Sequence, residues 1–353
     1  MTAKTSPLAR RPQVASYEFR YVSNMDVKAL LTPAQSLRLA EETLIDHHYG
    51  DVSFANVRQL DMAAPGQPTN YKAKGCVLAR LGVAGFRILG LNRTPEGYAL
   101  AGRRPTKHVL LSDTRTGEFF GVVDEHWSHA LRTGACAAAA SKYLMRPRSD
   151  VLAVTGTGYM AYASLVAMSA VMTPREVRIW ARDFGKAQTF AARMAGELGW
   201  KVIAIEDARS CVADASVVIT ATSSQTPYLE KSWFAPGVFI YALGNFQEVD
   251  LATYQGMTFM VDEREQVRIC PDIAAFIAQG IYDESWVQAD LGEVVARSDK
   301  RRRSEDEQII VRSQGLVTQD VAQAFWIYEE ACRRDMGVSL EPSLIAQAGA
   351  ALF

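Results

Sequence analysis

Cysteine is scarce in this chain, and the spacing that a disulfide framework or a zinc site needs is missing. The 353 residues include five cysteines, an odd number, and no two of them form a Cys-x-x-Cys pair. Disulfide scaffolds and structural zinc sites both rely on paired, closely spaced cysteines. The sequence therefore predicts unpaired thiols, a reducing and thus cytoplasmic location, and no metal site.

The chain also lacks an excess of charge of either sign and any long apolar run. Lysine and arginine number 38, against 39 for aspartate and glutamate, so no basic surface for DNA, RNA or an anionic membrane is expected. The longest mostly apolar stretch, residues 161–172, is too short to span a bilayer. No apolar run follows the basic N-terminal residues, so we expect no signal peptide. Nucleic acid and membrane are both excluded as expected partners.

The second half of the chain does contain a regular alternation of strand and helix patterns. Residues 151–155 and 176–180 are typical of buried strands, and helical segments follow them at 159–172 and 184–198. Such alternation predicts an α/β fold, a doubly wound parallel sheet of the Rossmann type. Further strands of this sheet are expected at 202–205, 216–221, 238–243, 257–261 and 308–312.

The first half has a different pattern. Residues 54–124 contain short β-type runs separated by glycine-rich turns, which predicts a second, β-rich domain. Residues 1–20 are polar, and we expect them to be loosely ordered. Helices are predicted to begin at Thr32-Pro33, to extend over the alanine-rich stretch 132–145, and to close the chain at 318–336.

A glycine motif follows the first strand of the predicted Rossmann domain. The segment 156–161 has the Gly-x-Gly-x-x-Ala form, and it comes directly between a buried strand and a helix. Gly156 permits the tight turn, Gly158 lets the backbone approach a pyrophosphate, and Ala161 allows helix and strand to pack closely. The free N–H groups of the helix then bind the phosphates. The motif predicts a nicotinamide dinucleotide as cofactor.

The end of the second strand bears on the choice between NAD(H) and NADP(H). An acidic residue at this place accepts a hydrogen bond from the 2′-hydroxyl of NAD, whereas an arginine suits the 2′-phosphate of NADP. This chain has both, with Arg182 before Asp183. We favour NADP(H), and NAD(H) stays possible. The cofactor-binding residues expected on these grounds are Gly156, Thr157, Gly158, Tyr159, Met160, Arg182, Asp183, Ala221, Thr222 and Ser223.

Several segments together resemble the ornithine cyclodeaminase/mu-crystallin family of NAD(P)-binding proteins. They are the Arg-Thr-Gly-Ala segment that begins at Arg132, the Gly156 motif, residues 213–224 with Pro227, residues 261–266 and 290–295, and the long segment 303–320. The Arg-Thr-Gly-Ala start combined with the last segment is fairly specific. The resemblance covers most of the chain, from about residue 54 to about 330.

The resemblance implies an architecture and a mode of assembly. A Rossmann domain, residues 131–312, is inserted into a β-rich α+β domain formed by residues 21–130 and 313–353, and residues 1–20 are a flexible extension. Family members are typically homodimers that pair through the α+β domain. Their substrates are small amino or imino acids, bound where the nicotinamide points.

Arg132, Arg87 and Lys74 are the residues that we expect to carry the chemistry. Arg132 matches the family arginine that grips the substrate carboxylate, which a guanidinium does with two parallel hydrogen bonds. Arg87 stands where the family usually has a lysine that polarises the reacting carbon–nitrogen bond. Arginine does not give up its proton at neutral pH. Proton transfer must then come from another group or from water, and Lys74 is the nearest candidate.

Substrate binding is also predicted at Arg58, Lys72 and Asn245. Arg58 is a possible second carboxylate clamp, and Lys72 alternates with Lys74 on one face of a strand. Asn245 stands nearest the place where cyclodeaminases carry an aspartate that handles amines, in a loop that is shorter here. An amide cannot accept a proton as a carboxylate does. Met160 is another departure, since the family often has glutamine in this motif.

These residues predict hydride transfer between NAD(P)H and the α-carbon of a small 2-imino acid. A cyclodeaminase, a lyase that recycles bound NAD and releases ammonia, is a second hypothesis, which Asn245 argues against. A non-catalytic, crystallin-like protein that binds dinucleotide and ligand is a third. His126 and His129 could bind a metal by their spacing, but no further cluster of ligands is evident in the sequence.

Overall fold

The computed structural model describes residues 6–12, 17–63, 65–92, 106–244 and 246–340. The chain divides into two compact units. We call the first the sheet unit; it comprises Met1–Gln35, Tyr49–His129 and Val317–Phe353. We call the second the Rossmann unit; it comprises Ser36–His48 and Ala130–Leu316. Helices α2 (Pro33–Tyr49) and α4 (His126–Leu144) each contribute residues to both units.

The Rossmann unit is built on a parallel sheet with the strand order β10-β9-β8-β11-β12-β15-β13-β14. Every neighbouring pair in it is parallel, and the order reverses at β8, as in a doubly wound fold. Its strands are β8 (Val151–Thr155), β9 (Glu176–Trp180), β10 (Val202–Ala204), β11 (Val217–Thr220), β12 (Phe239–Ala242), β13 (Thr258–Val261), β14 (Val287–Asp290) and β15 (Ile309–Arg312).

The central strands of this sheet are buried on both faces, which is why their sequences are continuously apolar. On one face, side chains such as Ala153, Val218 and Ile240 pack with residues of the connecting helices into a core cluster. The connecting helices of the unit are α5 (Tyr159–Met168), α6 (Phe184–Leu198), α7 (Ala208–Val212), α8 (Leu251–Gly256), α9 (Arg264–Val267), α10 (Pro271–Ala278) and α11 (Leu291–Ala296).

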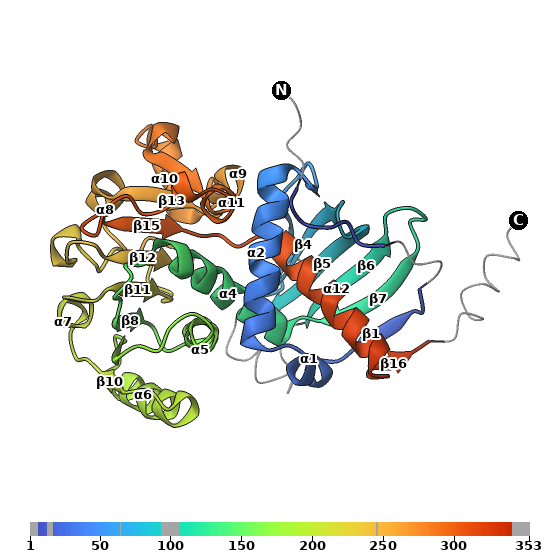
Figure 1. The fold of residues 1–353 in the computed structure, drawn as a ribbon, viewed down its shortest axis with the longest axis horizontal. Helices are drawn as coiled ribbons and strands as arrows, with labels where there is room; N and C mark the ends of the chain where they lie inside the picture. The colour runs from blue at the N-terminus through green and yellow to red at the C-terminus, as the bar shows by residue number, and fades with distance from the viewer. Residues whose placement is uncertain (1–5, 13–16, 64, 93–105, 245, 341–353) are drawn as a thin grey trace, which may run out of the picture. The chain divides into compact units, whose positions relative to one another are not determined.

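The sheet unit holds a mostly antiparallel sheet with the strand order β16-β1-β7-β6-β5-β4-β2, and β3 pairs with β4. Helix α12 (Val317–Arg333) lies across one face of this sheet (Figure 1). The other elements are α1 (Asn24–Leu30), β1 (Arg20–Val22), β2 (Val52–Phe54), β3 (Leu60–Ala63), β4 (Thr69–Leu78), β5 (Val83–Asn92), β6 (Thr106–Asp113), β7 (Phe119–Asp124) and β16 (Val338–Ser339).

Aromatic packing explains why α12 stays on its sheet. Phe120 of β7 contacts Phe325 and Tyr328 of α12 edge-on, with ring centroids 6.1 and 4.9 Å apart. Tyr17 stacks on Phe120 at 4.0 Å, and the guanidinium of Arg11 lies 4.3 Å above the Phe325 ring. The described part of the N-terminal extension therefore packs on this core, where the sequence predicts a loose segment.

The elements differ from the sequence predictions at a few boundaries. Helix α5 ends at Met168, four residues early, and α4 begins at His126, six residues before the alanine-rich stretch. Strand β14 is not among the predicted strands; it pairs with β13 at the sheet edge. All five cysteines are free thiols. Among the described residues, no helix combines the length and apolar composition that crossing a membrane requires.

Candidate active site

A cavity of about 1230 Å³ lies at the carboxyl ends of β8, β9 and β11 in the Rossmann unit. All ten residues predicted to bind the cofactor line it. Seven further lining residues were not predicted, and two of them, Trp180 and Tyr228, stack with ring centroids 4.9 Å apart. The others are Ala181, Lys186, Ser224, Gln225 and Thr226. The sequence offered one indication of these aromatic side chains in the cavity wall: Trp180 is the last residue of a predicted buried strand, shortly before Arg182 and Asp183.

Gly156 turns the chain from β8 into α5 in a way that only glycine permits. Its φ is +109°, and a Cβ atom there would lie 2.4 Å from the carbonyl oxygen of Ala221. Gly158 is the N-cap of α5 and provides no side-chain cap, while a Cβ on it would meet open space. The first N–H groups of α5 therefore carry no side-chain cap beside the cavity. These are the features that a dinucleotide pyrophosphate requires.

Arg182 and Asp183 differ in what their side chains do. Asp183 caps α6: its carboxylate accepts a hydrogen bond from the Lys186 backbone N–H at 3.1 Å and lies 3.6 Å from the Lys186 ammonium. Arg182 is exposed and lines the cavity. The carboxylate that would select NAD thus serves the helix N-terminus, and Arg182 and Lys186 both add positive charge at the cavity.

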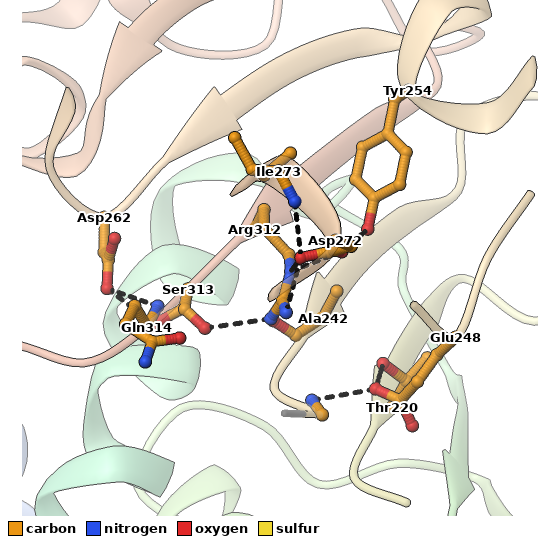
Figure 2. Close-up of polar contacts among 11 residues, drawn as sticks. Thr220, Ala242, Glu248, Tyr254, Asp262, Asp272, Ile273, Arg312, Ser313 and Gln314 are labelled. Atoms are coloured by element: carbon orange, nitrogen blue, oxygen red, sulfur yellow. Dashed lines mark hydrogen bonds and ion pairs between the residues drawn. The ribbon is translucent and has the colours of Figure 1, made fainter. Parts of the chain in front are cut away.

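Glu248 is a buried carboxylate that joins two loops at this edge of the sheet. It accepts hydrogen bonds from the hydroxyls of Thr220 (2.5 Å), Thr222 (2.6 Å) and Tyr228 (3.1 Å). It also accepts from the backbone N–H groups of Thr222 and Gly244, both at 2.8 Å. Figure 2 shows Glu248 beside Thr220. Thr222 and Tyr228 line the cavity, so Glu248 holds one wall of it in place without lining it.

A second buried carboxylate, Asp262 at the end of β13, holds the turn that follows β15. It accepts from the Ser313 hydroxyl at 2.9 Å and from the N–H groups of Gln314 and Gly315 at 2.8 and 2.6 Å (Figure 2). Burial raises the pKa of Asp262, although these hydrogen bonds oppose the rise. Gly315, with φ +85°, lies against Arg132: a Cβ there would be 2.5 Å from its Nη1.

Arg132 is buried, and its guanidinium therefore has a packed environment within the Rossmann unit. Strand β15 is fixed beside the same turn by a buried ion pair. The Arg312 guanidinium donates to both carboxylate oxygens of Asp272 at 2.9 to 3.1 Å, and Tyr254 donates to the same carboxylate at 2.8 Å. The turn that supports Arg132 is thus held by two buried carboxylates, Asp262 and, through Arg312, Asp272.

In the sheet unit, Arg87 of β5 lies in a buried cluster of charged groups. Its Nε donates to both carboxylate oxygens of Glu125, at 2.6 and 2.8 Å, and lies 3.7 Å from Asp320 of α12. His129 Nδ1 lies 3.2 Å from the other oxygen of Asp320. We call these four residues the Arg87 cluster. Burial lowers the pKa of Arg87, but the two carboxylates more than offset this and raise it overall.

Three members of this cluster have the spacing of metal ligands. Atoms of Glu125, His129 and Asp320 lie within 4.8 Å of one another. Both oxygens of Glu125 are bound by the Arg87 guanidinium, so these carboxylates already have a cation between them. The pair suggested by the sequence is not brought together, because His126 Nδ1 contacts Asp124 at 2.6 Å instead of sharing a site with His129.

The remaining predicted residues lie in different surroundings. Lys74 is directly opposite Arg87 in the β4–β5 pairing and is half-buried. Lys72 forms an ion pair with Asp61 of β3 at 3.3 Å. The Arg58 guanidinium lies 3.7 Å above the Phe54 ring, and Asn245 lies outside the described residues. Their substrate contacts stay predictions.

Glu125, Glu248, Asp262 and Asp320 were not predicted, although each is central to this geometry. The sequence feature that could have pointed to them is their place: each is an acidic residue within a few positions of a strand end or inside an apolar helix. Such residues are common at exposed loops, so the sequence alone did not distinguish the buried ones.

Residues 77–335 match the model of the Ornithine cyclodeaminase/mu-crystallin family. The chain is 31% identical over 238 residues to an alanine dehydrogenase of Archaeoglobus fulgidus, covering 66% of this chain and 73% of that protein. It is 30% identical over 227 residues to the ketimine reductase mu-crystallin of Rattus norvegicus (63% and 68%). It is 27% identical over 266 residues to a Delta(1)-pyrroline-2-carboxylate reductase of Bacillus cereus (73% and 82%).

Solved structures give the same result over nearly the whole chain. The iminosuccinate reductase of Paracoccus denitrificans in complex with NAD⁺ has a TM-score of 0.84 at 26% identity, covering 92% of this chain and 99% of that one. An archaeal alanine dehydrogenase dimer with bound NAD has a TM-score of 0.83 at 26% identity, with the same coverage. The predicted fold class and family resemblance are both confirmed.

The Glu248 contacts lead to a prediction about cofactor affinity. Replacing Glu248 with Gln places an amide N–H₂ among five donors, and each buried donor left unpaired costs about 1–3 kcal/mol. We expect the dinucleotide dissociation constant, measured by calorimetry, to rise about tenfold or more, since about 1.4 kcal/mol corresponds to a factor of ten. Glu230→Gln, which changes an exposed carboxylate of the same unit, is the control. An unchanged constant in a folded Glu248→Gln variant would contradict this role.

Proposed function

The chain belongs to the ornithine cyclodeaminase/mu-crystallin family and is an NAD(P)-dependent oxidoreductase, and we propose that it reduces a small 2-imino acid by hydride transfer at the α-carbon. The reverse reaction is oxidation of the corresponding amino acid. The observation that carries the proposal is the cavity at the Gly156 turn, in a chain whose relatives are named reductases and dehydrogenases of such compounds. A cytoplasmic location, argued from the unpaired cysteines, is part of the proposal.

In this proposal, one set of residues binds the cofactor and another binds the substrate. The bound dinucleotide supplies the hydride. The Gly156 turn and the N–H groups of α5 hold its pyrophosphate, with Glu248 fixing the opposite loop. Arg132 grips the substrate carboxylate with its planar guanidinium. The packing of Arg132 against Gly315 fixes the orientation of that guanidinium before substrate arrives.

The two alternatives are less well supported. Two solved structures that resemble this chain, a probable ornithine cyclodeaminase and a lysine cyclodeaminase, are 21% and 24% identical to it, and such a likeness concerns the fold alone. A protein that only binds its ligand would not need Arg132 to be held in one orientation by a buried, braced turn. Relatives with named reductase activity favour catalysis.

A substrate panel tests the proposal together with Arg132. Oxidation of NADPH and NADH is followed with cyclic 2-imino acids and with 2-oxo acids plus ammonia or methylamine. We expect turnover by the wild type and a loss of about 10²-fold or more in kcat/KM for Arg132→Ala, because removing a charge-assisted bidentate contact costs about 3 kcal/mol or more. Arg148→Ala, at an exposed arginine, should behave as wild type. Unchanged kcat/KM in Arg132→Ala would refute the assignment.

We further propose that NADP(H) is the preferred cofactor. Arg182 is exposed at the cavity, and Lys186 lies in the first turn of α6 beside it. Both are cations that favour a 2′-phosphate. The Asp183 carboxylate, which would repel that phosphate, is turned toward the N-terminus of α6 and caps it.

Replacing Arg182 with Ala should therefore weaken NADPH selectively. We expect KM for NADPH to rise about tenfold, or about 1.4 kcal/mol, while KM for NADH stays nearly constant. The comparison is made by steady-state kinetics with both cofactors. Arg209→Ala removes an exposed arginine of α7 away from the cavity and serves as the control. Equal losses for both cofactors would argue against recognition of the 2′-phosphate.

We also propose a homodimer formed through the sheet unit. Phe86 and Ile88 of β5 are 45% and 46% exposed, and Tyr71 of β4 and Phe119 of β7 are exposed on the same sheet. These four apolar side chains lie on β4, β5 and β7 of one sheet, and alternation along β5 places Phe86 and Ile88 on the face opposite Arg87. Exposed apolar patches of this kind are typical of protein interfaces. The named dimer of an archaeal alanine dehydrogenase supports this assignment.

Charge introduced into this patch should break the dimer. We expect the wild type to have twice the chain mass by light scattering and Phe86→Glu to have the mass of one chain, since a buried unpaired carboxylate is strongly unfavourable. Ile269→Glu, at an exposed apolar residue of the Rossmann unit, should leave the mass unchanged. A dimeric Phe86→Glu variant would place the interface elsewhere.

A further inference from the structure

The proposed reaction requires a proton as well as a hydride. The hydride forms a bond to the imine carbon, the π electron pair of the C=N bond moves to nitrogen, and a proton must form the new N–H bond. Arg87 cannot supply it, because a guanidinium keeps its proton and Glu125 and Asp320 raise its pKa further. The donor must be a different group, and finding it is a question that rests on the proposed function.

His129 and Asp320 have the geometry of an acid–base pair. The Nδ1 atom of His129 lies 3.2 Å from a carboxylate oxygen of Asp320. The carboxylate is 1% exposed, whereas the imidazole is 17% exposed. The carboxylate therefore lies behind the ring and fixes its orientation, and the ring itself keeps contact with the outside. A carboxylate placed in this way stabilises the charged imidazolium and leaves proton transfer to Nε2.

Two buried carboxylates lie beside His129 and favour its protonated form. Atoms of Glu125, His129 and Asp320 lie within 4.8 Å of one another, and both carboxylate side chains are 1% exposed; a nearby negative charge stabilises an imidazolium. Arg87 and, opposite it on β4, Lys74 bring positive charges to the same face of the sheet. The Cys76 thiol of β4 stays neutral because burial raises its pKa.

The position of His129 on α4 also suits the role. Arg132 follows it by three residues on the same helix, and residues three apart on a helix project from the same side, with Cβ atoms about 5–6 Å apart. In a 2-imino acid, the carboxylate and the reacting nitrogen are attached to the same carbon. A carboxylate clamp and a proton donor one turn apart match that compact substrate.

We propose that His129, oriented by Asp320, donates the proton to the substrate nitrogen during imine reduction and accepts it during amine oxidation. Arg87 is then a positioning residue, which pairs with Glu125 and neutralises one carboxylate of the cluster. Lys74, the donor that the sequence suggested, becomes the rival whose variant the experiment must include.

The test compares four variants with the wild type, on the substrate that the panel identifies; one of them, His129→Ala, serves for rescue by added imidazole. His129→Gln removes the proposed donor. His126→Gln is the matched control, since it changes a histidine of the same helix turn that also pairs with an aspartate, Asp124. Lys74→Gln removes the rival. Dinucleotide affinity by calorimetry and thermal melting are recorded for each, to separate loss of chemistry from loss of fold.

We expect His129→Gln to lower kcat for imine reduction by about 10²–10⁴-fold, the usual effect of removing a general acid, with dinucleotide affinity preserved. In the wild type, kcat for reduction should fall as pH rises through the ionisation of His129, because the protonated form donates. The His129→Gln variant should lose this dependence. Added imidazole should restore part of the activity of His129→Ala, which a purely structural role would not allow.

Other outcomes separate the two proposals. A wild type without turnover on the panel defeats the proposed function, and the inference about His129 falls with it. Turnover by the wild type with an equally active, equally pH-dependent His129→Gln variant overturns the inference alone. Loss of activity and of the pH dependence in Lys74→Gln, but not in His129→Gln, assigns the proton to Lys74 instead.

Discussion

Three carboxylates are buried where the parallel strands of the Rossmann unit end, and the loops at this edge depend on their hydrogen bonds. Glu248 fixes the loop after β11, Asp262 fixes the turn after β15, and Asp272 holds Arg312. Loops at this edge have backbone N–H groups that no strand can satisfy. A carboxylate accepts several such donors at once, and these hydrogen bonds offset the free-energy cost of burying its charge.

The same constraint explains why an arginine can stand in β5. A lone buried guanidinium would be prohibitively costly, and a lysine at this position could have shed its proton instead. Arg87 stays charged, so the fold must supply anions, and it does so from two other elements, at Glu125 and Asp320. One of these carboxylates, Asp320, also contacts Nδ1 of His129. The anions that make a buried arginine tolerable therefore also fix the position of the histidine that we propose as proton donor.

The sequence was sufficient wherever local patterns decide structure. Strands β8 and β9 and helix α6 were predicted at their observed bounds, because short runs rich in β-branched residues and a capping Asp183 specify them locally. Strand β14 was missed since its four residues alternate exposed and buried at a sheet edge. The early start of α4 was missed because its first residues, His126 to His129, are weak helix formers. The buried acids were missed because their burial depends on distant segments.

Cofactor and substrate recognition differ in how far a sequence can reveal them, and the structure gives the physical reason. The cavity that we assign to the dinucleotide is shaped largely by backbone: a glycine turn, a helix N-terminus and a loop fixed by Glu248. Such geometry demands particular residues in a fixed order, which a motif records. The Arg87 cluster, which we propose for the substrate side, is built from side chains on β5, α4 and α12, which the chain brings together from positions more than 200 residues apart. No short motif records such an arrangement. The reaction type can therefore be inferred from the first kind of site, whereas the proposed proton donor depends on the second.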